Sequence, residues 1–230
     1  MAAESGAAGP ALACPVCGVT GPFRDHPRSG RRNASCGHCG ARERHRLLAL
    51  YLKGHPAEGQ AGREPPLAGR RLLHVSPESI LEPLLGDVAE YVTGDLTDPE
   101  VDLAIDLTAT GLPARSFGAV MANHVLEHIP DDRAALAELF RILEPGGLAV
   151  ITVPVVEGWE RTYEDPAIDT PELRELHFGR WDHVRWYGRD LRLRIAAAGF
   201  DLEVWQPSPA DCVTYALHRG ASVFVGHRPG

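Results

Sequence analysis

Residues 116–154, SFGAVMANHVLEHIPDDRAALAELFRILEPGGLAVITVP, decide the fold of this chain. The apolar run at 117–122 predicts a buried strand. Residues 131–143 carry apolar side chains three and four positions apart and predict an amphipathic helix, which the Pro-Gly-Gly at 145–147 ends. A second apolar run at 148–153 predicts another strand. Strand, helix and strand in this order indicate two parallel neighbours in one sheet.

The same alternation continues on both sides of this stretch. We predict strands at 72–75, 90–93, 102–105, 202–205 and 222–225, and helices at 79–85 and 190–198. The fold class is therefore α/β, a Rossmann-like and mostly parallel sheet with helices on both faces. Ligands of such sheets bind outside the carboxyl ends of the strands, so we expect the functional residues directly after the strands.

The length of 230 residues suits one α/β domain and a small appendage. No apolar run approaches the roughly 18 residues that a membrane span requires. Residues 1–10 lack the cationic start and apolar core of a secretory signal. We therefore expect a cytoplasmic protein, a monomer or homodimer with no membrane partner, whose cysteines are reduced.

Four cysteines mark the appendage. Cys14 and Cys17 form one Cys-x-x-Cys pair, and Cys36 and Cys39 form a second pair after 18 intervening residues. Each pair lets two thiolates point at one ion, and this spacing is typical of a zinc ribbon. Because sulfur fills all four positions, we expect a structural Zn²⁺ with no open site for water.

The charge is divided unevenly along the chain. Residues 1–71 hold 11 Lys and Arg against 5 Asp and Glu, whereas residues 72–230 hold the remaining 12 against 26. We expect a zinc ribbon plus basic helix over 1–53, a linker over 54–69 and the α/β domain over 70–230. The basic residues could bind nucleic acid or contact the acidic half. We favour the contact, which argues against a nucleic-acid partner without excluding one.

Polar residues follow three of the predicted strands. Asp95, Asp106 and the pair Asn123-His124 each come where a strand ends. An acid at such a place can accept hydrogen bonds from the ribose of a nucleoside, although strand-end carboxylates also serve as helix caps. Together these residues outline a nucleoside-binding edge.

The chain at this point resembles the class I S-adenosylmethionine-dependent methyltransferases of the small-molecule type. The resemblance covers residues 72 to about 225 and rests on 116–130, with its phrase Val125-Leu-Glu-His128, and on 131–154. The ribbon running into Glu43-Arg-His-Arg46 is similar to a subgroup with an N-terminal zinc ribbon. The resemblance implies S-adenosylmethionine as cofactor, with its ribose at Asp95, its adenine at Asp106 and Leu107, and its methionine portion at Asn123 and His124.

The first loop departs from this family. Where the family has an acidic residue and then a glycine-rich loop, this chain has His74, Ser76, Glu78 and Ile80. Ser76 could cap a helix whose N-terminus faces the cofactor's carboxylate, and Glu78 could pair with its ammonium. Alternatively, the loop does not bind cofactor; we expect that it does, because the later strands keep their polar ends.

The long segment 155–188 is dense in polar and aromatic residues and is expected to cover the acceptor. His183 is the candidate base, with Asp182 or a distant acid to orient it, and Arg185 could hold an anionic substrate. A structural network of the same side chains is the alternative. His124 is a rival base nearer the methyl group, and His128 is expected to brace the next helix. The remaining candidate substrate-binding residues are Tyr163 and Tyr187.

These observations predict methyl transfer to an oxygen or nitrogen of a small-molecule acceptor. A general base is needed only where the acceptor must lose a proton. Two alternatives stay open. One is a ribosomal RNA base methyltransferase that uses the basic ribbon to bind RNA, and the other is a non-catalytic interaction protein with this fold.

Overall fold

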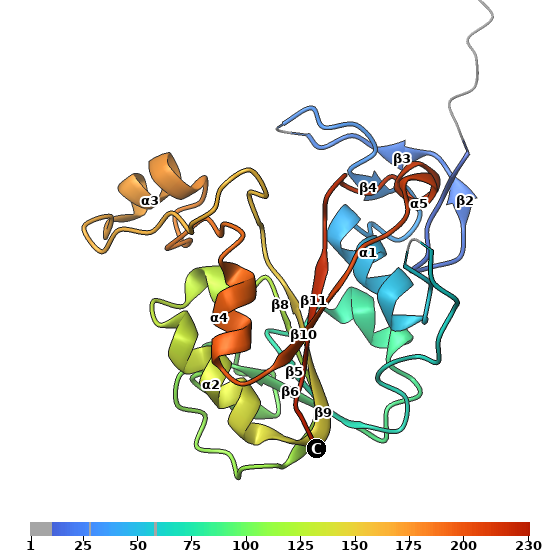
Figure 1. Cartoon of the computed structure of the whole chain (residues 1–230). Helices are drawn as coiled ribbons and strands as arrows, with labels where there is room; N and C mark the ends of the chain where they lie inside the picture. The colour runs from blue at the N-terminus through green and yellow to red at the C-terminus, as the bar shows by residue number, and fades with distance from the viewer. Residues whose placement is uncertain (1–10, 28, 58) are drawn as a thin grey trace, which may run out of the picture.

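The structure is a computed structural model that describes residues 11–27, 29–57 and 59–230 (Figure 1). Residues 1–10, on which the expectation about a secretory signal rests, lie outside the described residues. Within the described part of the chain, no helix is long and apolar enough to cross a membrane.

One seven-stranded sheet organises the chain, with the strand order β10-β11-β9-β8-β5-β6-β7. Strands β5 to β9 run parallel to one another, whereas β11 is antiparallel to both β9 and β10. The predicted Rossmann-like, mostly parallel sheet is thereby confirmed. The strands are β5 (Arg71–Val75), β6 (Glu90–Asp95), β7 (Leu103–Ala104), β8 (Phe117–Asn123), β9 (Leu143–Thr152), β10 (Asp201–Trp205) and β11 (Val223–His227).

Strand β8 shows how the sheet divides two cores. All seven of its residues are buried. Val120 and Ala122 face the core beneath helices α2 (Asp132–Ile142) and α4 (Leu191–Ala197), while Ala119 and Met121 face the opposite core. Side chains alternate between the two faces of a strand, so a strand buried on both sides reads as one continuous apolar run.

The opposite face is covered by helix α1 (Glu43–Leu52), which Figure 1 shows on the other side of the sheet from α2 and α4. Its side chains Leu48 and Tyr51 share one core with Leu72 of β5 and Trp205 of β10. Helix α1 therefore packs as a layer of the α/β domain, whereas the sequence analysis assigned it to the N-terminal module. The 3₁₀ helix η1 (Ser79–Leu84) and the short helix α5 (Pro209–Thr214) complete this side.

The N-terminal cysteines lie in two small hairpins, which pack beside α1 and α5 (Figure 1). The favoured contact between the basic segment and the acidic half is present: Arg44 pairs with Glu78, His55 with Asp211, and Arg63 with Glu203. The hairpin strands are β1 (Leu12–Ala13) with β2 (Thr20–Gly21), and β3 (Phe23–Arg24) with β4 (Ser35–Cys36).

Two local predictions need correction. The helix expected at 79–85 is a 3₁₀ helix, because Pro83 lacks the N–H that a longer α-helical ladder requires. Helix α3 (Pro171–Phe178), within the segment expected to cover the acceptor, was not foreseen. It begins at Pro171 after the capping hydroxyl of Thr170 and ends at Gly179 with φ of 76°, which are standard start and stop signals.

Candidate functional site

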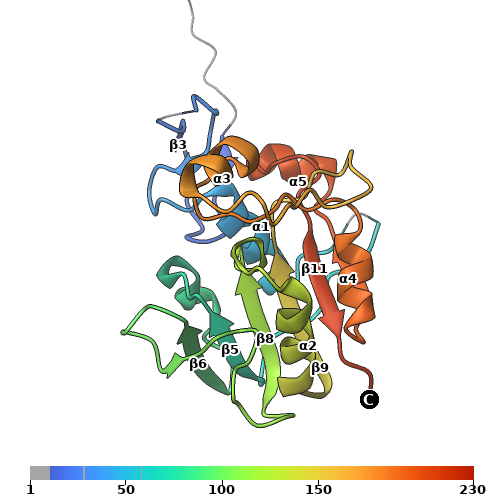
Figure 2. The same ribbon diagram turned by 90° about the vertical axis from the view of Figure 1, so that its left-hand side faces the viewer.

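The parallel strands bring the predicted functional residues to one edge of the sheet. Strands β5, β6, β8 and β9 are parallel, so their carboxyl ends meet at the same edge. In Figure 2, α3 and the ribbon strand β3 both lie beyond that end of β5 and β8. The edge is thus flanked by the N-terminal module and by the segment 155–188.

The turn after β5 is held to the end of β6. Ser76 has φ of 49°, a left-handed conformation that favours glycine, and its hydroxyl donates to Oδ2 of Asp95 at 2.5 Å. Ser76 therefore does not cap a helix as predicted. The loop has no glycine here, but Ser76 adopts the left-handed backbone conformation that glycine favours.

Asp95 organises the loop that follows β6. Its Oδ1 accepts hydrogen bonds from the backbone N–H groups of Thr97 and Asp98. Burial alone would raise the pKa of this carboxyl, but the hydrogen bonds from Ser76 and this loop lower it. Each carboxylate oxygen has two acceptor positions, so Oδ2 keeps one for a further donor such as a ribose hydroxyl.

Glu78 is engaged within the protein. Its Oε1 accepts hydrogen bonds from Arg44 and from Nε2 of His45, both on α1. Burial opposes ionisation of Glu78, but the hydrogen bonds from His45 and Arg44 outweigh it and lower the pKa to about 2. Glu78 thus fastens α1 to the first loop, and the ammonium of a cofactor would compete with these partners.

His74 lies inside the sheet rather than at its edge. Its side chain is fully buried, and its Nδ1 lies 2.9 Å from the hydroxyl of Tyr91. Burial lowers the pKa of His74 to about 4, so the imidazole is neutral at neutral pH. The predicted contact of His74 with a cofactor is not seen in this arrangement.

The next strand ends carry open hydrogen-bonding capacity. Asp106 is exposed, and its Oδ1 accepts from the N–H and hydroxyl of Thr108, while Leu107 is buried in the core. Asn123 is buried, with Oδ1 accepting from Thr152 at 3.3 Å and, among the described residues, no partner for Nδ2. A buried amide without an acceptor is costly, and an anionic group of a ligand at this edge would satisfy it. The residues present therefore fit a cofactor with a carboxylate.

His124 follows β8 and is oriented by a buried acid that the sequence analysis missed. His124 has φ of 54°, and its Nδ1 lies 3.0 Å from Oε1 of Glu127. The side chain of Glu127 is 1% exposed and that of His124 is 29% exposed. The spacing of three residues was the available sequence signal, since it places two side chains on one face of a helical turn. This pair is the arrangement expected of a positioned general base.

His183 and Asp182 do not form the predicted pair. Asp182 binds Arg180, and its backbone oxygen lies 3.0 Å from Nδ1 of His128. The ring of His183 instead packs edge-on against that of His128, with centroids 4.8 Å apart. His183 is buried, which lowers its pKa, and its Nδ1 has no hydrogen-bond partner among the described residues.

Arg185 and Tyr187 belong to a buried network. Arg185 is 4% exposed and donates to Glu164 and to the backbone oxygens of residues 126, 129 and 130. The hydroxyl of Tyr187 donates to Asp132 at 2.8 Å. These donors fix the segment 155–188 to the start of α2 and to the residues before it, as in the structural alternative, and do not face an anionic substrate. Tyr163 is 37% exposed, and its hydroxyl lies 2.6 Å from Nδ1 of His177.

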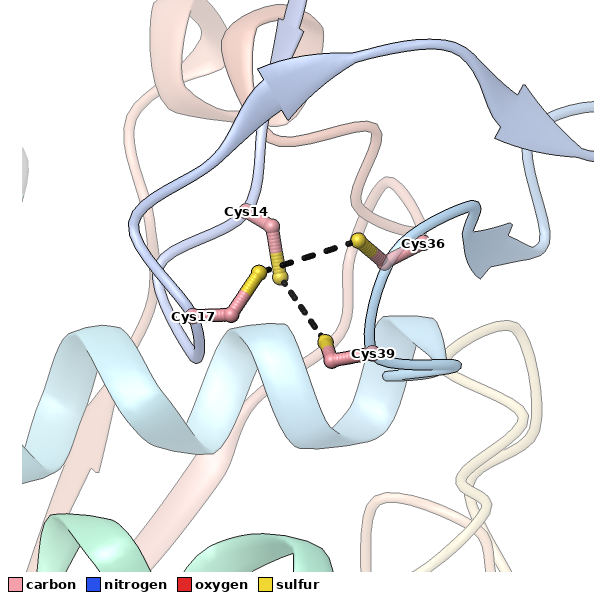
Figure 3. A group of neighbouring side chains, drawn as sticks. All are labelled: Cys14, Cys17, Cys36 and Cys39. Atoms are coloured by element: carbon pink, nitrogen blue, oxygen red, sulfur yellow. Dashed lines mark hydrogen bonds between the residues drawn. The ribbon is translucent and has the colours of Figure 1, made fainter.

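The four N-terminal cysteines point towards one centre (Figure 3). The sulfurs of Cys14 and Cys39 are 3.7 Å apart, those of Cys17 and Cys36 are 3.9 Å apart, and all four lie within 4.8 Å of one another. A tetrahedral Zn²⁺ with bonds of about 2.3 Å requires sulfurs about 3.8 Å apart. The set therefore fits a structural zinc ion.

Comparisons with known proteins find similarity to methyltransferases. Residues 82–151 match a family model described as a methyltransferase domain. The chain is 30% identical over 149 residues to a probable S-adenosylmethionine-dependent methyltransferase of Mycolicibacterium smegmatis, covering 59% of this chain and 54% of that protein. It is also 30% identical over 130 residues to a sterol 24-C-methyltransferase of Yarrowia lipolytica, covering 55% of this chain and 30% of that protein.

The solved structures agree on the fold. The cyclase SpnF superimposes with a TM-score of 0.50 and 16% identity, covering 70% of this chain and 76% of that chain. With the sheet order above, the chain has the class I methyltransferase fold. The chain spans about half or less of the length of these curated relatives. Because SpnF is described as a cyclase, the fold alone does not determine the reaction.

Proposed function

We propose that this protein transfers the methyl group of S-adenosylmethionine to an oxygen or nitrogen of a small-molecule acceptor. The main support is the edge of the sheet that carries Ser76, Asp95, Asn123 and His124. The chain also matches a methyltransferase domain over residues 82–151. The cofactor supplies an electrophilic methyl group. The protein has to bind it, hold the acceptor in line and exclude water.

Each strand end has a defined part in this proposal. Asp95 accepts a ribose hydroxyl through the open position on Oδ2, and exposed Asp106 accepts from the adenine, with Leu107 packing behind it. The unpartnered Nδ2 of Asn123 donates to the cofactor's carboxylate. Glu78 contributes indirectly, because its bonds to α1 keep the first loop in place.

His124 is the proposed base for acceptors that must lose a proton. Its Nδ1 is held by Glu127, which leaves Nε2 as the nitrogen that can take the proton. The buried Glu127 positions the ring and stabilises the imidazolium that forms. His183 is a less suitable base, because it is buried and its pKa is lowered.

The charge distribution supports a small acceptor over RNA. Arg44 and Arg63 of the basic segment are paired with acids, and Arg46 is fully buried. The ribbon therefore has fewer cations to neutralise phosphates than its composition suggests. Salt-sensitive retention of the protein on RNA would favour the RNA alternative instead.

Calorimetric titration with S-adenosylhomocysteine, the product of the cofactor, tests the proposal. The wild type should bind, and Asp95→Asn should weaken binding by about tenfold, the effect of losing about 1.4 kcal/mol of charged hydrogen bonding. Asp98→Asn is the matched control, since Asp98 is an acid of the same turn whose Oδ1 accepts only from the N–H of Glu100. Absence of binding to the wild type would refute the proposal and favour the non-catalytic alternative.

A further inference from the structure

A second cluster of metal-binding side chains lies beside His124. Glu127, His128 and His183 each offer one ligand atom, and these atoms all lie within 4.8 Å of one another. Glu127 and His128 belong to the 3₁₀ helix η2 (Leu126–His128), which begins shortly after β8, and His183 comes from the segment 155–188. None of the three residues is part of the Cys₄ set.

Two of these side chains are buried, and each has one polar atom without a hydrogen-bond partner among the described residues. Glu127 is 1% exposed and His183 is 6% exposed, yet Oε2 of Glu127 and Nδ1 of His183 have no hydrogen-bond partner among the described residues. Leaving such buried atoms unsatisfied destabilises the folded protein. An ion bound between them would remove this cost, since a carboxylate oxygen and a neutral imidazole nitrogen are both good ligands.

The third ligand is already oriented for a metal. Nδ1 of His128 lies 3.0 Å from the backbone oxygen of Asp182. A carbonyl oxygen can only accept, so Nδ1 carries the hydrogen and Nε2 presents its lone pair. Histidine ligands of metals are commonly fixed in this way by a bond from the second ring nitrogen.

The geometry requires only small movements. Ligand atoms bound at about 2.1 Å around one ion lie about 3.0 to 3.4 Å apart. One ligand atom of each residue already lies within 4.8 Å of the other two, so binding an ion requires the three side chains to move closer together. The backbone is already fastened, because the N–H of Val184 donates to the backbone oxygen of Glu127 at 2.9 Å.

We propose that Glu127, His128 and His183 bind a divalent transition-metal ion, Zn²⁺ being the one that two imidazoles, one carboxylate and an open position suit best. The open position distinguishes this site from the closed Cys₄ site. The role of the ion rests on the proposed function: near His124, it would bind an oxygen of the acceptor and promote loss of its proton. The acceptor class is then a hydroxyl compound or another oxygen ligand of metals.

The test measures metal content and needs neither cofactor nor acceptor. Full-length protein is equilibrated with Zn²⁺ by dialysis, and the bound metal is counted per chain. The wild type should hold one more Zn²⁺ than Glu127→Gln, His128→Gln or His183→Ala. His177→Ala is the matched control, because His177 lies in the same segment but bonds to Tyr163, and it should keep the wild-type count.

Loading with Co²⁺ separates the two sites. The Cys₄ site would give a thiolate-to-cobalt charge-transfer band in every variant, whereas the second site would add ligand-field bands that the three variants lose. Glu127→Gln preserves the size of the side chain, so it remains informative if His183→Ala does not fold. An equal metal count in the wild type and Glu127→Gln, with identical cobalt spectra, would overturn the proposal and leave the proposed function untouched.

Discussion

Replacement of Arg46 should cause a large loss of stability, because this side chain joins three parts of the molecule. Arg46 is fully buried on α1, and its guanidinium lies 4.5 Å from the centre of the Phe23 ring. Burial lowers its pKa, but a guanidinium stays charged at neutral pH. It donates to five backbone oxygens, those of Asn33, Ala34, Ala41, Tyr215 and Ala216.

The magnitude follows from what Arg46→Met would leave behind. Methionine fills much of the space but donates to none of the five carbonyls. Each buried carbonyl left without a donor costs about 1 kcal/mol, and water that enters the site would reduce this cost. The free energy of unfolding should therefore fall by about 4 kcal/mol. In a chain of this size that lowers the melting temperature by about 8 to 16 °C.

Urea unfolding at 25 °C in zinc-containing buffer measures this loss as a shift in midpoint. Arg46→Lys keeps the charge and reaches at most three carbonyls, so it should lose about half as much as Arg46→Met. Arg189→Met is the control, since Arg189 is half-exposed and 3.6 Å from Glu160, and it should change stability by less than about 0.5 kcal/mol. A loss below about 1 kcal/mol for Arg46→Met would refute the reasoning.

Two further predictions concern the metal and the pH. Cys17→Ser should lose the tightly bound Zn²⁺ of the ribbon, whose binding contributes on the order of 10 kcal/mol, whereas Cys212→Ser should keep it; metal analysis after dialysis decides this. His74 has a folded-state pKa of about 4, below its unfolded value, so the unfolded chain binds the proton first as the pH falls. The wild type should therefore lose about 2 kcal/mol relative to His74→Asn between pH 7 and pH 5. A pH-independent difference between the two proteins would contradict the assignment.

The sequence predicted the sheet well because burial leaves a local pattern. The strands found at 71–75 and 117–123 contain the apolar runs that predicted them, and the strand at 143–152 contains the run at 148–153 except for its last residue. Helix α2 was found within one residue of its predicted bounds, since Asp131 caps its start and the apolar periodicity ends at Ile142. The cysteine pairs were equally clear, because their spacing is itself the ligand geometry.

The candidate site was predicted less completely, because its partners come from distant parts of the chain. Glu78 is 34 residues from Arg44, and nothing in the local sequence shows that α1 would reach it. Arg185 was predicted to bind a substrate because the sequence shows its charge but does not show that the side chain is buried. Glu127 was missed because the spacing of three residues from His124 is common in sequences, and the burial of its carboxylate is known only from the structure.

The sequence by itself determined the alternating α/β order, the polar strand ends and the four-cysteine set, since each depends on residues close together in the chain. Only the tertiary structure decided that α1 forms a layer of the sheet domain, and that His183 joins Glu127 and His128. The physical reason is that hydrophobic periodicity is repeated along a helix or strand and can be read locally. The hydrogen-bond partner of a buried polar side chain comes from a distant part of the sequence, and only the folded chain brings the two together.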